Sequence, residues 1–256
     1  MVSEARKLTN GLSATDEPGG FGSFALVGPV VSVVIPTLNE EDGIASALSE
    51  LPVARLKETG FASEIVVVDG NSSDETVERA ERFGARVLVE SRLGYGLAYK
   101  TGFTATRGEF LVAFDGDHSY PASLVPKLIE IMVERDLDFI TTNRLVGLEP
   151  DAMDAIHRLG NWVLSTAVRL LFSVRISDSQ SGMWVIRKSA LEKILPKSDG
   201  MAFSQEIKIR AFKSCKCLEV PIQYRKRIGN PKIQLAVDGF RNLLHLIKLR
   251  FSIDFR

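Results

Sequence analysis

The sequence is poor in cysteine and histidine, and it has no long hydrophobic run. Its 256 residues include two cysteines and three histidines. Cys215 and Cys217 are too close in the chain for an unstrained disulfide, and a zinc site would need two further ligands nearby, so a reducing compartment is expected. The most apolar segments carry Arg or Lys, and none reaches the roughly 18 to 20 residues of a membrane-spanning helix. Residues 1–20 contain no apolar signal-peptide core, so a cytoplasmic location is expected.

Neither sign of charge is in net excess, because 32 Lys and Arg residues balance 32 Asp and Glu residues. With 45% hydrophobic and 25% charged residues, the composition is that of a globular chain and excludes a disordered or fibrous one. The charge is uneven along the chain, since residues 207–256 hold twelve basic and three acidic residues. This basic end predicts an anionic partner, although a solvated basic face would give the same pattern.

The hydrophobic pattern predicts one α/β domain between two terminal segments. Residues 1–28 lack an apolar period and are expected to form a flexible leader. From Pro29 to residue 232, apolar runs alternate with helical patterns, which predicts a single domain with a mostly parallel sheet flanked by helices. The expected strands are 30–35, 64–68, 86–89, 109–114, 138–142 and 184–187. The expected helices are 42–51, 73–83, 96–106, 121–135, 154–172 and 203–213.

Polar residues follow three of the expected strands, at the end of the sheet where ligands bind. The first segment is VVIPTLNEE, in which Thr37 or Asn39 could simply cap a helix. In the second, EIVVVDGNSSDET, Asp69 could accept hydrogen bonds from a ribose or a base. The third, GEFLVAFDGDHSYP, presents Asp115 and Asp117 around one glycine, which favours Mg²⁺ or Mn²⁺ completed by substrate phosphates. Because no GxGxxG follows the first strand, a nicotinamide cofactor is disfavoured.

Together these segments resemble the nucleotide-sugar half of family-2 glycosyltransferases with the GT-A fold. Later segments are similar to the polyprenyl-phosphate sugar synthases, such as dolichyl-phosphate mannose synthase. They are TNR at 142–144, ISDSQSGMWVIRKSAL at 176–191, FSQEIKIRA at 203–211 and YRKRIGNPK at 224–232. The resemblance covers about residues 30–233 and implies a Rossmann-like GT-A domain. It also implies metal-dependent transfer of a sugar, with inversion, from a UDP- or GDP-sugar to a polyprenyl or dolichyl phosphate.

The resemblance further implies a set of site residues. Asp115, Asp117 and Ser119 are expected to hold the Mg²⁺ or Mn²⁺, and Asp117, Arg144 and Glu206 are the candidate catalytic residues. The residues expected to bind the nucleotide sugar are Pro36, Leu38, Glu40, Val68, Asp69, Gly70, Asp115, Gly116, Asp117, Arg144, Arg225, Arg227 and Lys232.

The chain also departs from the family pattern. Many mannose synthases have two adjacent acidic residues where this chain has Asp69-Gly70, and a serine where it has Pro231, so the base and the sugar stay open. Gln180 and Trp184 do not form the QxxRW pattern of processive members, which disfavours polymer synthesis.

The nature of the acceptor decides whether the reaction needs a general base. A polyprenyl phosphate is ionised near neutral pH, so Arg144 would only need to position it. A hydroxyl acceptor on a saccharide or small molecule would need a base, and Glu206 is the candidate. A solvent-exposed carboxylate at a helix start is the structural alternative for Glu206.

Residues 233–256 are expected to form an amphipathic basic helix. Apolar residues recur at helical spacing from 233 to 251, with Arg241, Lys248 and Arg250 around them. Such a helix would make a peripheral contact with the cytoplasmic face of a membrane, while closure of the domain's own core and a dimer contact are the alternatives. Nucleic acid is disfavoured because the basic tail lacks interleaved aromatic residues. A non-catalytic basic module that docks on nucleic acid or anionic lipid is the alternative from another class.

Overall fold

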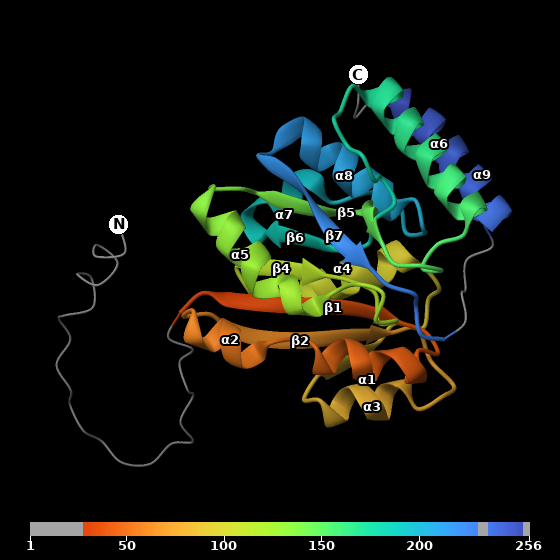
Figure 1. The fold of residues 1–256 in the computed structure, drawn as a ribbon. Coiled ribbons are helices and arrows are strands. Elements are labelled where there is room, and N and C mark those ends of the chain that lie inside the picture. The colour runs from red at the N-terminus through yellow and green to blue at the C-terminus, as the bar shows by residue number, and fades with distance from the viewer. Residues whose placement is uncertain (1–27, 230–234, 253–256) are drawn as a thin grey trace, which may run out of the picture.

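A seven-stranded sheet forms the centre of the protein (Figure 1). The computed structural model describes residues 28–229 and 235–252. The strand order is β3-β2-β1-β4-β6-β5-β7. Strand β6 is antiparallel to its neighbours β4 and β5, and the other paired strands run parallel. The strands are β1 (Val30–Thr37), β2 (Ala62–Asp69), β3 (Arg86–Val89), β4 (Phe110–Ala113), β5 (Phe139–Leu148), β6 (Trp184–Arg187) and β7 (Cys217–Tyr224). The predicted fold class, a single α/β domain with a mostly parallel sheet, is confirmed.

Helices cover both faces of this sheet. They are α1 (Glu41–Ser49), α2 (Val53–Glu58), α3 (Thr76–Arg82), α4 (Tyr95–Ala105), α5 (Val125–Glu134), α6 (Ala155–Phe172), α7 (Lys188–Ile194), α8 (Phe203–Ser214) and α9 (Leu235–Arg250), with a short 3₁₀ turn, η1, at Ala122–Leu124. The sequence did not predict α2, α7 or β7. Helices α2 and α7 have six and seven residues, which is too short for a helical period to stand out.

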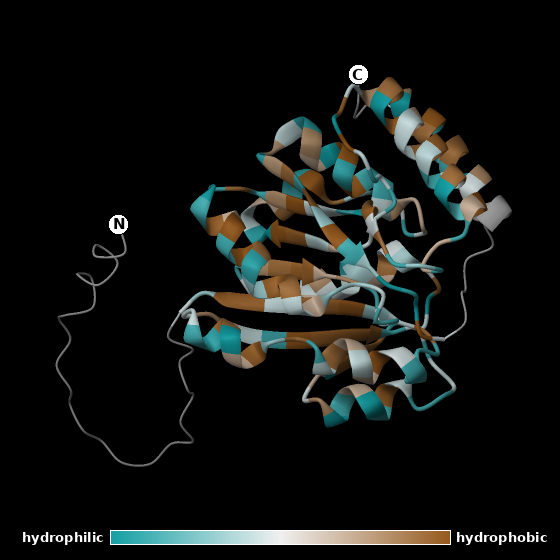
Figure 2. Cartoon of the chain, in the orientation of Figure 1, coloured by the Kyte–Doolittle hydropathy of each residue, from teal (hydrophilic) through white to brown (hydrophobic). Residues whose placement is uncertain are grey.

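The core consists of two layers, one on each face of the sheet. Val33 and Ile35 of β1 pack with residues of α1, α2, α3 and α5, whereas Val34 packs with residues of α4, α7 and α8. A strand that is buried on both sides must be apolar at consecutive positions, which explains the run VVSVVI in β1. Figure 2 shows this hydrophobic character along the strands of the sheet.

Helices α6 and α9 lie side by side at one edge of the molecule (Figure 1). Leu164, Val168 and Phe172 of α6 pack with Leu246 and Leu249 of α9 in a third cluster, which also includes Ile209 of α8. The predicted tail helix therefore packs on the domain through one of its faces. Within the described residues, no helix combines the length and the hydropathy that a membrane crossing requires.

Candidate active site

The Asp115-Gly116-Asp117 turn lies immediately beyond β4, in the middle of the sheet. Asp117 is 6% exposed, and its Oδ1 accepts hydrogen bonds from the Ser119 amide (3.0 Å) and the Ser119 hydroxyl (2.5 Å). Asp115 accepts a hydrogen bond from the hydroxyl of Tyr95 at 3.0 Å. The turn thus holds two carboxylates in fixed orientations. Ser119 positions Asp117 here, and its role as a metal ligand stays a prediction.

Close backbone packing fixes this turn against α1. A Cβ atom on Gly43 of α1 would lie 2.8 Å from both the Cα of Asp117 and the carbonyl oxygen of Gly116, closer than a real side chain allows. Beyond the turn, His118 has a positive φ of 63°. Asn39 and Asn71, in the loops after β1 and β2, also have positive φ values, of 50° and 68°. Non-glycine residues with such angles often mark functional loops.

The electrostatics of the turn fit a divalent cation. Burial and the neighbouring carboxylate of Asp117 raise the pKa of Asp115 to about 7, although the Tyr95 hydroxyl, Arg144 and Arg227 act in the opposite direction. No group of three or more Asp, Glu, His or Cys side chains in the described part of the chain is placed to hold a metal. A cation on Asp115 and Asp117 would therefore need further oxygen ligands from phosphates or water, as Mg²⁺ and Mn²⁺ sites commonly use.

The loops after β1 and β2 form one hydrogen-bonded unit beside this turn. The buried carboxylate of Asp69 accepts hydrogen bonds from the Thr37 hydroxyl (3.1 Å), the Ser72 amide (2.7 Å) and the Ser72 hydroxyl (2.5 Å). The Ser72 hydroxyl also accepts from the Asn39 amide at 2.8 Å. Asp69 thus orders both loops with three protein hydrogen bonds, and its contact with a ribose or a base stays a prediction.

The other residues predicted to contact the nucleotide lie in the same two loops. Pro36 and Leu38 are partly exposed, and Val68 is buried. Gly70 lies beside Leu38, because a Cβ atom added at Gly70 would be in ordinary contact, at 3.5 Å, with the Leu38 side chain. The amide of Glu40 donates to the Thr76 hydroxyl at 2.8 Å. The structure therefore brings the first two sequence motifs together.

The basic segment after β7 lies across the Asp115-Gly116-Asp117 turn, which we term the metal-binding turn after its predicted role. Arg227 contacts Glu40 at 3.0 Å and Asp117 at 3.5 Å, and the Ile228 amide donates to the carbonyl oxygen of Asp117 at 2.9 Å. Arg225 instead pairs with both carboxylate oxygens of Glu50, at 2.7 and 2.8 Å. Arg227 is thus at the turn, whereas Arg225 ties the segment to the end of α1. The predicted phosphate contact of Lys232 lies outside the described residues.

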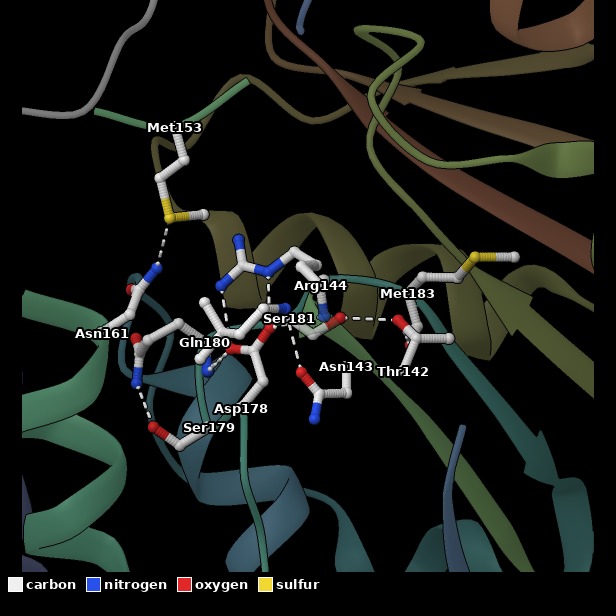
Figure 3. Close-up of polar contacts among 12 residues, drawn as sticks. Thr142, Asn143, Arg144, Met153, Asn161, Asp178, Ser179, Gln180, Ser181 and Met183 are labelled. Atoms are coloured by element: carbon white, nitrogen blue, oxygen red, sulfur yellow. Dashed lines mark hydrogen bonds and ion pairs between the residues drawn. The ribbon is translucent and has the colours of Figure 1, made fainter. Parts of the chain in front are cut away.

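Arg144 forms a buried pair with Asp178 (Figure 3). Its Nε and Nη2 atoms donate to the two carboxylate oxygens of Asp178 at 2.7 and 2.9 Å, and its guanidinium lies 5.2 Å from the ring centre of Tyr224. Burial opposes these charges, but the pair still raises the pKa of Arg144 and lowers the pKa of Asp178. The pair therefore fixes the edge of the guanidinium that carries Nε and Nη2, and the Nη1 atom lies outside the pair.

Residues 178–183, termed the clamp turn, connect Arg144 to the metal-binding turn. Asp178 starts the clamp turn, and the amide of Gly182 donates to the Tyr120 hydroxyl at 2.5 Å. A Cβ atom on Gly182 would lie 2.9 Å from Asp115 Oδ2 and from the Tyr95 hydroxyl. The arginine pair and the two carboxylates thus adjoin one another, although they come from segments far apart in the sequence.

Glu206 belongs to a different contact network. It is fully buried in α8, where it accepts hydrogen bonds from the amide of Lys197 (3.0 Å) and from Arg210 (2.8 Å) and contacts His245 of α9 at 3.3 Å. Although burial alone would raise the pKa of Glu206, these hydrogen bonds lower it to about 2. None of these contacts includes Asp115, Asp117 or Arg144, so the structure does not bring Glu206 together with them.

Several residues of the site were not predicted from the sequence. Tyr95 and Tyr120 contact the metal-binding turn and the clamp turn, and Gly43 allows α1 to approach. Asp178 lies in a segment that reads equally well as an ordinary turn, and Lys208 is hidden in an amphipathic helical pattern. The tyrosines follow small clusters of glycine or carboxylate residues, which is too weak a signal to assign a role.

A mostly parallel α/β sheet with two carboxylates at the end of a central strand fits the GT-A fold that the sequence predicts. Residues 32–195 match the family model described as glycosyl transferase family 2. The chain belongs to glycosyltransferase family 2, and it is a glycosyltransferase.

Two relatives from Haloferax volcanii support this assignment. The chain is 34% identical over 247 residues to the low-salt glycan biosynthesis hexosyltransferase Agl6. This alignment covers 93% of this chain and 59% of that protein. It thus spans about three fifths of that relative's length. The chain is also 32% identical over 211 residues to a dolichyl-phosphate hexose transferase. This second alignment covers 82% of this chain and 89% of that protein.

A solved structure shares the fold. The glucosyl-3-phosphoglycerate synthase from Mycobacterium tuberculosis, in complex with Mn²⁺, UDP and glucosyl-3-phosphoglycerate, aligns with a TM-score of 0.69 and 22% identity. The alignment covers 92% of this chain and 86% of that chain. This likeness confirms the GT-A-like architecture.

Proposed function

We propose that the protein transfers a sugar from a nucleoside diphosphate sugar to a polyprenyl or dolichyl phosphate. The observation that carries this proposal is the juxtaposition of two sites. The carboxylate pair Asp115 and Asp117 suits a metal-bound diphosphate, and the buried Arg144–Asp178 pair adjoins it through Gly182. An arginine held in this way presents a fixed cation for a second phosphate.

The donor is expected to bind between the loops after β1 and β2 and the metal-binding turn. A cation held by Asp115 and Asp117, with Mn²⁺ or Mg²⁺ as the candidates, would neutralise charge on the leaving diphosphate. Arg227 lies 3.5 Å from Asp117, from where it could contact the same diphosphate. The solved structural relative contains Mn²⁺ and UDP, which supports a UDP-sugar, and a GDP-sugar is the alternative.

The acceptor is expected to be a phosphate monoester, whose second ionisation has a pKa of about 6. Its ionised oxygen bonds to the anomeric carbon while the bond from that carbon to the diphosphate breaks, and the diphosphate leaves with the electron pair. This displacement inverts the anomeric centre and requires no proton transfer to a base. Arg144 would hold the acceptor phosphate in line with the breaking bond.

The environment of Glu206 supports an ionised acceptor over a hydroxyl acceptor. A carboxylate with a pKa of about 2 is a weak base, and Glu206 contacts Arg210 and His245 rather than the metal-binding turn. The name of one relative, a dolichyl-phosphate hexose transferase, supports the same choice.

The lipid acceptor implies contact with a membrane, and α6 and α9 together offer a surface for it. Large apolar side chains are exposed on both helices, and arginine and lysine residues are exposed among them. The exposed apolar residues are Ile156, Leu159, Trp162, Val163 and Leu170 of α6, and Phe240, Leu244 and Ile247 of α9 with the adjacent Phe251. We refer to them as the apolar face, and we expect it to rest on the cytoplasmic leaflet. The predicted contact of residues 233–251 is thereby extended to α6.

A donor panel tests the proposal. Wild type is incubated with radiolabelled UDP- and GDP-sugars, dolichyl phosphate and Mn²⁺, and label in the organic phase is counted. We expect one donor to label the lipid, and Asp117→Ala to lower the rate by at least about a hundredfold. Phosphoglyceric acid serves as a soluble comparison acceptor. Label in that compound alone, with none in the lipid, would contradict the proposed acceptor.

A further inference from the structure

The side chain of Lys208 is fully buried in α8, beneath the clamp turn. Its Nζ donates hydrogen bonds to the carbonyl oxygens of Ser179 (2.8 Å) and Ser181, and to the Ser204 hydroxyl (3.4 Å). Lysine is rarely buried unless its ammonium group has partners. Here two of the three partners are backbone carbonyl groups of the clamp turn, so the ammonium fixes the path of the turn itself.

The clamp turn transmits this restraint to the acceptor side of the site. Its first residue, Asp178, holds Arg144 through two hydrogen bonds from the guanidinium and a third, at 3.1 Å, from the Arg144 amide. At its other end, Gly182 adjoins Asp115. A shift of the carbonyl groups at 179 and 181 would therefore move Asp178 and change the direction of the Arg144 guanidinium.

We propose that Lys208 is a positioning residue for the acceptor phosphate, which it orients through the clamp turn, Asp178 and Arg144. This inference rests on the proposed function. It assigns Lys208 no contact with the substrate. It predicts that the loss of the ammonium group weakens acceptor binding while donor binding and the metal-binding turn stay intact.

The ionisation of Lys208 provides a signature that a purely structural residue would not have. Burial, together with the nearby charge of Arg144, lowers the pKa of Lys208 to about 7, although Asp178, Glu219 and Asp115 act in the opposite direction. The ammonium form is therefore present below pH 7 and is lost above it. Acceptor KM is expected to rise between pH 7 and pH 9, and nucleotide affinity is expected not to follow it.

The test compares Lys208→Met with Lys213→Met, which removes a lysine from the exposed side of the same helix. Acceptor KM and kcat are measured with dolichyl phosphate. The Kd of the matching nucleotide, UDP or GDP, is measured with Mn²⁺. We expect Lys208→Met to raise acceptor KM by about tenfold or more at pH 6.5, with kcat and nucleotide Kd within about twofold of wild type. Lys213→Met should match wild type in all three quantities.

Three results would overturn the inference. They are an unchanged acceptor KM in Lys208→Met, an equal rise in nucleotide Kd, and an acceptor KM of wild type that stays flat from pH 7 to pH 9. The pH series uses wild type alone, so it decides the matter even if Lys208→Met does not fold. Lys208→Arg, which keeps its charge, should remove the rise in KM above pH 7. If wild type transfers no sugar to dolichyl phosphate, the proposed function fails first, and this inference fails with it.

Discussion

Three carboxylates show how surroundings change the acidity of one chemical group. Asp115, which adjoins a second carboxylate, has a pKa raised to about 7, and this favours a cation. Asp178 has a lowered pKa because Arg144 pairs with it. Glu206 has a pKa of about 2 because His245, the Lys197 amide and Arg210 hydrogen bond to it. The sequence shows three acidic residues, but only their neighbours in the fold separate the predicted metal ligand from an arginine anchor and a carboxylate held in a hydrogen-bond network.

Glu206→Gln tests the structural role of this carboxylate. Because its pKa is lowered from 4.5 to about 2, ionised Glu206 stabilises the fold above pH 4.5, and this contribution is lost as the pH falls through about 2. We expect the variant to lower the free energy of unfolding by about 3 kcal/mol at pH 7, with a smaller difference at pH 3. Urea denaturation at both pH values measures this.

The matched control is Glu192→Gln, an exposed carboxylate of α7, whose effect should be below about 0.5 kcal/mol. Sugar transfer per folded molecule of Glu206→Gln should stay within about twofold of wild type. A loss of transfer by a hundredfold or more in folded protein would show that Glu206 acts as a base, which contradicts the structural role.

At the scale of single elements, the sequence predicted the first half of the sheet well. The apolar runs of β1, β4 and the second half of β2 are buried on both sides, so their pattern depends little on which helix covers them. The second half was harder to predict, because β6 is antiparallel to β4 and β5 and its four residues show no feature of strand direction. The last strand, β7, combines charged and apolar residues at the edge of the sheet, and the sequence did not predict it.

The side-chain pairings between distant elements could not be predicted from the sequence either. Arg225 was predicted to hold a phosphate, and nothing in its local sequence points to Glu50, its partner 175 residues earlier. The Asp178 anchor of Arg144 is similarly 34 residues away. Motifs thus predicted a chemistry for the site, while the pairings that orient its side chains depend on the fold.

The packing of α1 against the metal-binding turn gives a prediction at this scale. In Gly43→Ala, the new methyl group would clash with the backbone of Gly116 and Asp117, so the turn or the helix must move. We expect a loss of about 1 to 3 kcal/mol in the free energy of unfolding and about tenfold weaker Mn²⁺-dependent nucleotide binding. Calorimetric titration measures the binding, and urea denaturation measures the stability.

Gly160→Ala is the control, because a Cβ atom at Gly160 of α6 meets open space. It should leave nucleotide binding unchanged. Wild-type nucleotide affinity in Gly43→Ala would show that the close approach of α1 does not position Asp117.

On the scale of the whole molecule, the tail helix has two apolar sides. Leu246 and Leu249 are buried against α6 and α8, while Phe240 and Ile247 are 62% and 44% exposed. The sequence predicted the amphipathic helix, and it left open whether the helix would dock on a membrane or pack on the domain. One side packs on the domain. The other side joins the exposed residues of α6, a pairing that no local pattern shows.

The apolar face predicts reversible binding to lipid vesicles. Removal of one large anchor from each helix, in the variant Trp162→Ser with Phe240→Ser, should weaken binding to anionic vesicles by at least about tenfold. Phe83→Ser is the control, because Phe83 is exposed directly after α3, and α3 lies away from α6 and α9 (Figure 1). Vesicle sedimentation measures the effect. Equal binding of the double variant and wild type would contradict membrane contact through this face.

The most direct test of the central claim compares two acceptors that differ only in the phosphate group. Wild type is given the active donor sugar and Mn²⁺ with either dolichyl phosphate or dolichol, and the labelled lipid is quantified. We expect transfer to dolichyl phosphate, because Arg144 holds its phosphate and the ionised oxygen needs no base. We expect no transfer to dolichol, which has no phosphate and would need a base. Transfer to dolichol at a comparable rate would contradict the account, because the reaction would then need a base and no phosphate clamp.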